Sequence, residues 1–372
     1  MRVLSVFGTR PEAIKMAPVI QALGSDPYFD SLVCVTAQHR DMLDSVLNLF
    51  SITPDFDLDI MKANQDLTYI TTAVLNGLTE IFKQENPDRI LVHGDTTTTF
   101  AASLAAFYAN IPVGHVEAGL RSGNIHAPWP EEMNRRLADT ICDMLFTPTA
   151  SSRQNLINSG FSNKSIFVTG NTVIDALLHI SQRLDNENYL EEEFHAIFPK
   201  LDSEKKIILV TGHRRENFGT GFARVCDALR QLASRSDLEI VYPVHLNPNV
   251  KGLIEQQLGH SDHIILTPPL DYLPFVALMK RANIIITDSG GIQEEAPSLG
   301  KPVLVMREVT ERPEAVEAGT VKLVGTDTEK IVSEATRLLD DKNAYRKMSV
   351  AHNPYGDGNA SIRILEELRL VQ

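Results

Sequence analysis

The feature that most constrains the fold is a recurring unit in which a short apolar run leads through a turn into a helical pattern. Residues 2–7 are followed by a helical pattern over 11–23, and residues 32–36 by one over 40–50. Strands that are apolar throughout and alternate with helices are typical of a parallel sheet covered on both faces. The chain is therefore predicted to be a doubly wound α/β protein.

The same pattern continues through the first half and then starts again after a polar, acidic segment at residues 186–203. Further strands are expected at 89–93, 112–116, 144–147, 166–169, 206–211, 238–244, 264–266, 283–287 and 302–306. Further helices are expected at 99–108, 151–159, 218–234, 249–258, 273–281, 292–299, 331–339 and 360–370. At about 150 residues per domain, 372 residues suggest two domains. We expect two Rossmann-like domains facing a cleft, with ligands at the carboxyl ends of the strands.

Composition excludes several classes of function. The net charge of −13 argues against binding to nucleic acid or to an anionic membrane. Every apolar run is far too short to span a bilayer, and the N-terminus is typical of a first strand rather than a signal peptide. The three cysteines lack CxxC spacing, so no disulfide framework and no zinc site are expected. These features predict a cytoplasmic protein without a metal.

Three carboxylates stand where strands are expected to end. Asp95 follows one strand and Glu117 the next, while Glu131 begins a helix after a loop that contains Trp129 between two prolines. Capping and helix-dipole roles explain most carboxylates at such positions. If the three converge at one edge, their mutual repulsion favours separate acid and base roles.

Two strand ends could bind phosphate. Arg10 and Lys15 flank the start of the first helix, where Pro11 suits the first helical position, although both are equally consistent with solvated helix residues. In the second half, His213 precedes two arginines after a strand. Such a site faces a phosphate at least as often as it is purely structural.

The strongest local signal is the segment 287–296, which reads TDSGGIQEEA. A strand ends there, Ser289, Gly290 and Gly291 expose backbone N–H groups, and a helix begins, which is the geometry of a phosphate cradle. Glu295 lies about one turn into this helix, where a carboxylate can accept both hydroxyls of a ribose. The alternative is a glycine-rich turn with a capping serine.

Several nucleotide enzymes are excluded by missing motifs. The chain contains no Walker A pattern, no HExxH and no tyrosine followed four residues later by lysine. The glycines at 219 and 221 form only an incomplete dinucleotide fingerprint. A nucleotide-sugar epimerase that uses a bound nicotinamide is therefore disfavoured, and no cofactor is expected.

Taken together, the motifs resemble those of the non-hydrolysing bacterial UDP-N-acetylglucosamine 2-epimerases. Six blocks appear in the family's order: GTRPE (8–12), HGD (93–95), EAGLR (117–121), PEE (130–132), GHRRE (212–216) and DSGGIQEE (288–295). The match then continues to residues 353–358.

This resemblance implies a fold of the glycosyltransferase-B type, with an N-terminal domain over 1–170, a UDP-binding domain over 171–354 and a C-terminal helix, 355–372, that packs back on the first domain. It implies a homodimer that interconverts UDP-GlcNAc and UDP-ManNAc without a cofactor. The product would supply cell-surface polysaccharides such as enterobacterial common antigen. No nucleic acid or membrane partner is implied.

The resemblance also implies roles for individual residues. Family members eliminate UDP to leave 2-acetamidoglucal and then add UDP back, with C2 protonated on the other face. The implied catalytic residues are Asp95, Glu117, Glu131 and His213. Three of these catalytic residues, Asp95, Glu117 and His213, are also implied to contact the substrate. The other implied substrate contacts are Arg10, Lys15, Leu270, Phe275, Ser289, Gly290, Gly291, Glu295 and Arg312. Leu270 stands where some relatives have glutamine. A second, activating UDP-GlcNAc would be bound by Gln38, Asp41 and His245, and Asp41 again replaces a glutamine of some relatives.

Two alternatives of other classes stay open at this point. A glycosyltransferase of the same fold would need an acceptor and would leave C2 unchanged. A regulatory protein that only binds a UDP-sugar would not need three carboxylates at one strand edge. A hydrolysing epimerase would release free ManNAc, and product analysis with UDP-GlcNAc alone separates these possibilities.

Overall fold

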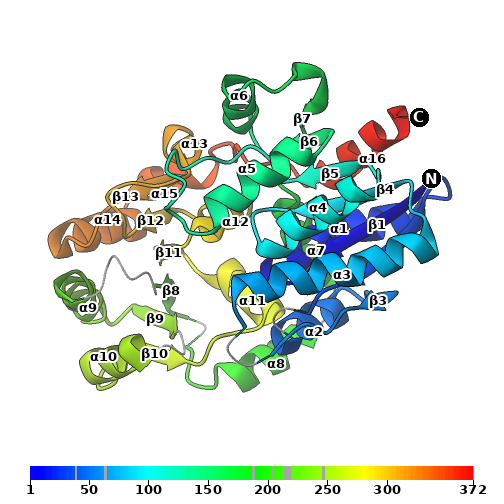
Figure 1. The fold of residues 1–372 in the computed structure, drawn as a ribbon. Coiled ribbons are helices and arrows are strands. Elements are labelled where there is room, and N and C mark those ends of the chain that lie inside the picture. The colour runs from blue at the N-terminus through cyan, green and yellow to red at the C-terminus, as the bar shows by residue number, and fades with distance from the viewer. Residues whose placement is uncertain are drawn as a thin grey trace. The chain divides into compact units, whose positions relative to one another are not determined.

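The computed structural model describes residues 1–37, 40–62, 65–186, 189–202, 204–212, 219–244 and 248–371, with only the backbone described at 41, 189–192 and 248–251. The chain divides into two compact units (Figure 1). Unit 1 comprises Met1–Ala176 and Tyr355–Gln372, and unit 2 comprises Leu177–Pro354.

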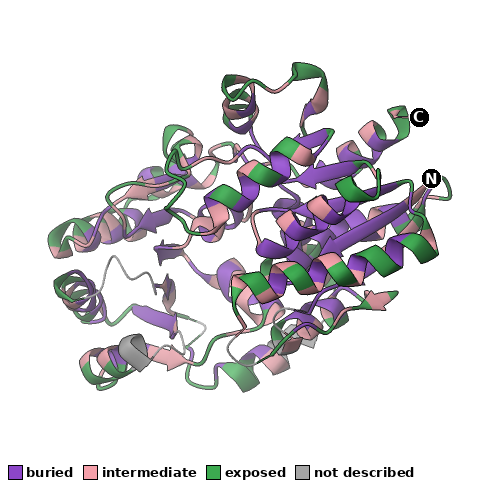
Figure 2. Cartoon of the chain, in the orientation of Figure 1, coloured by how far each residue is buried: buried purple, intermediate pink, exposed green. Residues whose placement is uncertain are grey.

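Unit 1 is built on a seven-stranded parallel sheet with the order β3-β2-β1-β4-β5-β6-β7. Its central strands β4, β5 and β6 are entirely buried because helices cover both faces (Figure 2). The strands are β1 (Arg2–Phe7), β2 (Asp30–Val35), β3 (Phe56–Asp57), β4 (Arg89–His93), β5 (Val113–Val116), β6 (Met144–Thr147) and β7 (Ile166–Val168).

The helices of unit 1 follow these strands along the chain. They are α1 (Arg10–Ser25), α2 (Arg40–Leu49), α3 (Leu67–Glu85), α4 (Thr97–Tyr108), α5 (Glu131–Ile141), α6 (Ala150–Asn158), the 3₁₀ turn η1 (Asn163–Ser165), the first turns of α7 (Thr172–Asn186) and α16 (Ala360–Leu370). The sequence analysis does not predict α3 or α7. Helix α3 buries a stripe that includes Ile70, Val74 and Leu78, with i, i+4 spacing, and exposes threonines between them, so its apolar signal is diluted.

The terminal helix α16 returns to the N-terminal part of the chain and packs against α1. The Asp175 carboxylate accepts hydrogen bonds from the backbone N–H groups of Ala360 and Ser361, at 3.2 and 2.8 Å. At the other end of the helix, Arg369 forms an ion pair with Asp26. Segments that are more than 180 residues apart are therefore joined within unit 1.

Unit 2 contains a six-stranded parallel sheet with the order β10-β9-β8-β11-β12-β13. Its strands are β8 (Lys206–Thr211), β9 (Leu238–Pro243), β10 (Ile264–Thr267), β11 (Ile284–Thr287), β12 (Val303–Val305) and β13 (Val321–Leu323). Its helices are the rest of α7, α8 (Tyr189–Ile197), α9 (Thr220–Leu232), α10 (Pro248–Leu258), α11 (Tyr272–Arg281), α12 (Gly290–Ser298), α13 (Pro313–Glu317), α14 (Thr328–Asp340) and α15 (Lys342–Ser349). The predicted class, two doubly wound parallel sheets, is confirmed.

The segment 186–203, which the sequence analysis takes as a seam, contains helix α8 and belongs to unit 2. Phe194 and Phe198 are 2% and 1% exposed and stack on each other, which explains why a polar segment folds there. Cys34, Cys142 and Cys226 are buried free thiols. Within the described residues, no helix combines the length and the apolar character that crossing a membrane requires, and no cluster of side chains could hold a metal ion.

Candidate active site

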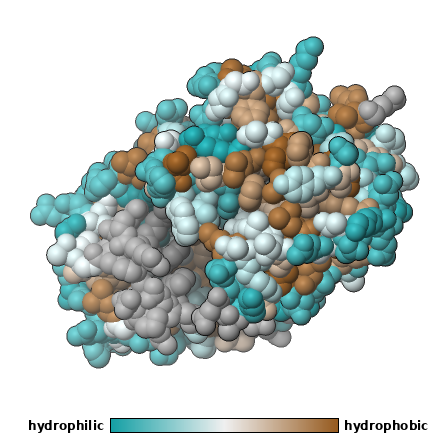
Figure 3. All heavy atoms as spheres, viewed as in Figure 1, coloured by the Kyte–Doolittle hydropathy of each residue, from teal (hydrophilic) through white to brown (hydrophobic). Residues whose placement is uncertain are grey.

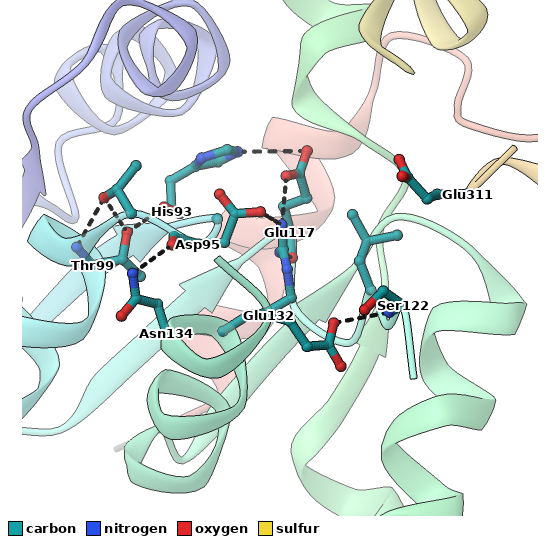
Figure 4. A network of polar contacts seen from close by, with 12 residues as sticks. His93, Asp95, Thr99, Glu117, Ser122, Glu132, Asn134 and Glu311 are labelled. Carbon is teal, nitrogen blue, oxygen red and sulfur yellow. Dashed lines mark hydrogen bonds and ion pairs between the residues drawn. The ribbon is translucent and has the colours of Figure 1, made fainter. Parts of the chain in front are cut away.

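The candidate site of unit 1 lies at the carboxyl ends of β1, β4 and β5. Because β4 pairs with both β1 and β5, the residues that follow these three strands meet at one edge of the sheet. The turn after β4 carries Asp95, the end of β5 carries Glu117, and α1 carries Lys15 after β1. Figure 4 shows His93, Asp95 and Glu117 in this cluster.

Glu117 is the centre of the cluster. Its backbone φ is +67°, a conformation that costs a non-glycine residue about 1–3 kcal/mol and that is common at functional sites. Its carboxylate forms ion pairs with Lys15 and, at 3.4 Å, with Arg135, and accepts a hydrogen bond from Asn171 Nδ2 at 3.0 Å. Burial raises the pKa of Glu117, but the charge of Lys15 and its other neighbours outweighs burial and holds the pKa well below its usual range. Glu117 is therefore an ionised carboxylate.

Asp95 is fixed by the neighbouring helix α5. Arg135 Nη2 lies 2.6 Å from Asp95 Oδ2, and Asn134 Nδ2 donates to the Asp95 backbone carbonyl at 3.0 Å. Arg135 also donates to the backbone carbonyl of Glu117. A single buried guanidinium therefore holds two of the three predicted carboxylates in fixed positions.

Glu131 is the first residue of the same helix α5, one turn before Arg135. Its Oε2 is buried, and no residue that the structure describes forms a hydrogen bond with it. A buried carboxylate oxygen without a partner costs about 1–3 kcal/mol or more, so such an oxygen is free to accept a hydrogen bond from a ligand. The loop before it presents Trp129, which is 66% exposed.

His93 is a further member of the cluster that the sequence analysis quotes within a motif but gives no role. The ring is buried, Nε2 lies 3.8 Å from Glu117 Oε2, and neither ring nitrogen has a hydrogen-bond partner among the described residues (Figure 4). Burial lowers the pKa of His93 to about 3. The imidazole is therefore neutral at physiological pH, and its two nitrogens can donate one hydrogen bond to a bound group and accept another.

Glu12 organises the turn between β1 and α1. Its carboxylate accepts hydrogen bonds from the backbone N–H groups of Gly8 and Thr9, at 3.0 and 2.8 Å, and from the hydroxyls of Thr96 and Thr99, at 2.6 and 3.2 Å. These two threonine hydroxyls are thus used within the protein. Arg10 begins α1 beside this turn and is partly exposed.

In unit 2, the N-terminus of α12 follows β11 directly. Ser289 is the N-cap, and a Cβ on Gly290 would lie 3.7 Å from Arg312 Nη2. Arg312 in turn forms an ion pair with the buried Glu294. The first N–H groups of the helix and a fixed guanidinium therefore face the same space, an arrangement that suits a phosphate.

Glu295 lies one turn further along α12 and accepts a hydrogen bond from the hydroxyl of Tyr272 at 2.8 Å. Tyr272 begins α11, and Phe275 lies on the same helix three residues later. Phe275 and Leu270 are partly exposed. Tyr272, a residue that the sequence motifs do not indicate, thus fixes the orientation of Glu295, the residue predicted to bind the ribose.

The structure brings together two groups of predicted site residues, each within one unit. Unit 1 gathers Asp95, Glu117 and Lys15, with Arg10 and Glu131 at the starts of neighbouring helices; unit 2 gathers Ser289, Gly290, Gly291, Glu295 and Arg312. His213, Gln38 and His245 lie outside the described residues, and of Asp41 only the backbone, within α2, is described. Residues that sequence reasoning missed include His93, Asn171, Tyr272 and Glu294, of which only His93 carries a local signal, its place at a strand end.

The fold and the site define the class of protein. Two doubly wound units, one with a carboxylate cluster and one with a glycine-rich helix N-terminus beside an arginine, form a two-domain α/β enzyme of the glycosyltransferase-B type. Comparison with known proteins then gives the family. The family model described as UDP-N-acetylglucosamine 2-epimerase matches residues 21–369, and the chain belongs to this family. The resemblance seen in the sequence is thus confirmed.

Individual relatives agree with this assignment. UDP-N-acetylglucosamine 2-epimerase of Escherichia coli strain K12 is 61% identical over 370 residues, which cover 99% of this chain and 98% of that protein. A solved epimerase from Neisseria meningitidis bound to UDP-GlcNAc is 52% identical, with a TM-score of 0.92 and full coverage of both chains. The epimerase from Methanocaldococcus jannaschii in complex with UDP-GlcNAc and UDP is 32% identical, with a TM-score of 0.83 and full coverage of both.

Proposed function

We propose that this chain interconverts UDP-GlcNAc and UDP-ManNAc by inverting C2 of the sugar without hydrolysis. The names of its relatives support this activity, and two solved relatives are bound to UDP-GlcNAc. The observation that carries the proposal is the cluster of unit 1, in which Glu117 is held ionised by Lys15 and Arg135 beside the neutral His93. A protein that only binds a nucleotide sugar does not need such a set of proton-exchanging groups.

The proposed reaction proceeds by elimination and re-addition. A base removes the C2 proton while the bond between C1 and the diphosphate oxygen breaks, leaving 2-acetamidoglucal and UDP. UDP then adds back at C1 as an acid protonates C2 on the opposite face. Two faces require two acid/base groups, and the proposed candidates are Asp95, Glu117, Glu131 and His213. The different surroundings of Glu117, which is ion-paired, and Glu131, which has an unpartnered oxygen, support a division of roles.

The leaving diphosphate requires positive charge and N–H donors. We assign this role to Ser289, Gly290 and Gly291 at the start of α12, with Arg312, Arg10, Lys15 and His213. Glu295 would accept the ribose hydroxyls, and Leu270 and Phe275 would lie by the uracil. The fixed orientation of Glu295 by Tyr272 supports its part in this assignment.

Hydrogen exchange at C2 tests the proposal. UDP-GlcNAc incubated with the protein in deuterium oxide, without any added cofactor, should give UDP-ManNAc that carries deuterium at C2, and prolonged incubation should label the recovered UDP-GlcNAc as well. Mass spectrometry and proton NMR measure both. Protium retained fully at C2 would overturn the elimination mechanism. No change at C2 in the absence of an acceptor would favour a glycosyltransferase, and free ManNAc would indicate a hydrolysing enzyme.

A homodimer is the proposed assembly. Apolar side chains gather on the surface of unit 1 over α4 and α5 (Figure 3), where Phe107, Met133 and Leu137 are 61%, 38% and 39% exposed. Contiguous exposed apolar residues of this kind mark protein interfaces. Sedimentation velocity should give twice the mass of the chain, and Leu137→Glu should shift the protein towards the monomer.

Allosteric activation and pathway complete the proposal. A second UDP-GlcNAc would bind through Gln38, Asp41 and His245 and raise the rate. Sigmoidal dependence of rate on substrate that becomes hyperbolic in His245→Ala, with a lower maximal rate, would support this site, and hyperbolic kinetics in the parent protein would overturn it. The product would supply ManNAc units for a cell-surface polysaccharide such as enterobacterial common antigen, made from nucleotide sugars in the cytoplasm.

A further inference from the structure

The turn that carries Asp95 is held by a second polar cluster within unit 1. His115 on β5 and Asp139 on α5 are both fully buried. His115 Nε2 lies 2.8 Å from the Gly94 carbonyl oxygen, and His115 Nδ1 lies 2.7 Å from Asp139 Oδ1. Arg121 Nη2 lies 2.6 Å from the other oxygen of Asp139. The ring therefore connects the turn after β4 to helix α5.

The partners of His115 fix its protonation by chemistry alone. A backbone carbonyl can only accept a hydrogen bond, so Nε2 must carry a proton. A carboxylate also only accepts, so Nδ1 must carry a proton as well unless Asp139 is itself protonated. The neutral imidazole has one N–H and cannot satisfy both contacts with an ionised Asp139. The two contacts thus require one more proton than a neutral imidazole and an ionised carboxylate carry together.

The surrounding charges place that proton on the ring. Burial raises the pKa of Asp139, but its contact with His115 and the charges of Arg121 and Arg135 outweigh burial, and the pKa lies below its usual range. The two guanidinium charges, of which Arg121 lies 2.6 Å away, act on Asp139 whatever the protonation state of the ring. Burial raises the pKa of the nearby Cys142 thiol, which leaves it neutral. Asp139 is thus the ionised partner, held between an imidazole on one oxygen and a guanidinium on the other.

We propose that His115 is a buried imidazolium that acts as a positioning residue for Asp95. It does so by donating to the Gly94 carbonyl while its other N–H is held by Asp139. Gly94 has a φ of +74° and donates its own N–H to the Val116 carbonyl at 3.0 Å, so the His115 contact fixes the next peptide group, the one that joins Gly94 to Asp95. The positioning role rests on the proposed function, because it assumes that Asp95 takes part in the reaction. The protonation state does not.

Loss of the proton would break this arrangement. A ring that is neutral at Nδ1 would face the Asp139 carboxylate with a lone pair, and a ring that is neutral at Nε2 would face the Gly94 carbonyl in the same way. Either tautomer gives up one of the two contacts. The turn that carries Asp95 would then lose one of its links to α5, while the contacts of Asp95 with Asn134 and Arg135 on the same helix remain.

The first test is the NMR spectrum of the full chain labelled with ¹⁵N-histidine, with His115→Gln used to assign the ring. We expect both ring nitrogens of His115 to carry a proton in the folded protein, as the two acceptor contacts require. In Asp139→Asn, an amide N–H can donate to Nδ1, so the ring should become neutral and keep only Nε2–H. An unprotonated ring nitrogen in the parent protein at pH 7, or an imidazolium that persists in Asp139→Asn, would overturn the proposal.

The second test uses paired variants and the rate of epimerisation. The glutamine side chain in His115→Gln offers one donor group and one acceptor oxygen. Because Asp139 and the Gly94 carbonyl are both acceptors, this oxygen must face one of them and cannot form a hydrogen bond with it. Turnover should therefore fall about 10-fold or more with little change in KM. Adding Asp139→Asn supplies the missing donor and should restore most of the turnover without any charge. Wild-type turnover in His115→Gln, or a double variant no faster than it, would overturn the positioning role. Failure of the epimerase proposal itself would leave the NMR result standing.

Discussion

The segment that carries Glu117 depends on Gly119, and replacing this glycine gives a sharp prediction. Gly119 has a φ of +81°, which costs an L-residue about 1–2 kcal/mol. A Cβ at this position would also overlap the Ser152 carbonyl oxygen and lie 2.9 Å from Leu156 Cγ. Overpacking of this kind costs about 1–3 kcal/mol. Gly119→Ala should therefore lower the free energy of unfolding of unit 1 by about 3 kcal/mol.

Differential scanning calorimetry measures this loss. For about 200 residues, 1 kcal/mol lowers Tm by roughly 2–4 °C, so Gly119→Ala should lower the transition of unit 1 by about 6–12 °C. Gly123→Ala is the matched control, because Gly123 has the same φ of +81° and a Cβ there would meet nothing within 4 Å. Its Tm should fall by only about 2–8 °C, the conformational cost alone. Equal shifts in the two variants would refute the argument that contact with Ser152 dominates.

Three further predictions concern the two sites. Glu131→Gln should lower turnover by about 100-fold or more while UDP affinity, measured by calorimetry, changes little, as expected for loss of proton transfer; near-normal turnover would reject an acid/base role. His93 binds a proton below about pH 6.5 in the unfolded chain but only near pH 3 in the folded protein, so stability should fall as the pH is lowered through this window. His93→Asn should remove about 3 kcal/mol of the loss of stability between pH 7 and pH 4. If urea unfolding gives both proteins the same loss of stability between these two pH values, the result would speak against the buried neutral ring. Tyr272→Phe removes the hydrogen bond to Glu295 and should weaken UDP binding about 5-fold, equivalent to about 1 kcal/mol, while kcat is preserved. Unaltered UDP affinity would argue against Glu295 as the residue that binds the ribose.

Much of the fold could be predicted from local patterns. The strands at 89–93 and 284–287 each contain three consecutive residues that are isoleucine, leucine or valine, a run that is typical of buried parallel strands wherever the rest of the chain lies. Helix α3 could not be predicted in the same way, because its exposed face carries threonines that dilute the apolar periodicity, and its stability comes from packing against α4.

The sequence by itself determined which residues end the strands: Asp95 after β4, Glu117 after β5, and the serine and two glycines that open α12. These positions are local properties of short segments. Only the tertiary structure decided what surrounds them. Lys15 is 102 residues from Glu117 in the sequence and Asn171 is 54 residues from it, yet both contact its carboxylate. Asp139, on a helix, contacts His115, on a strand. The charge state and proton affinity of a side chain depend on such neighbours. The order of β1, β4 and β5 in the sheet brings these side chains together, and no single segment of the sequence encodes that order.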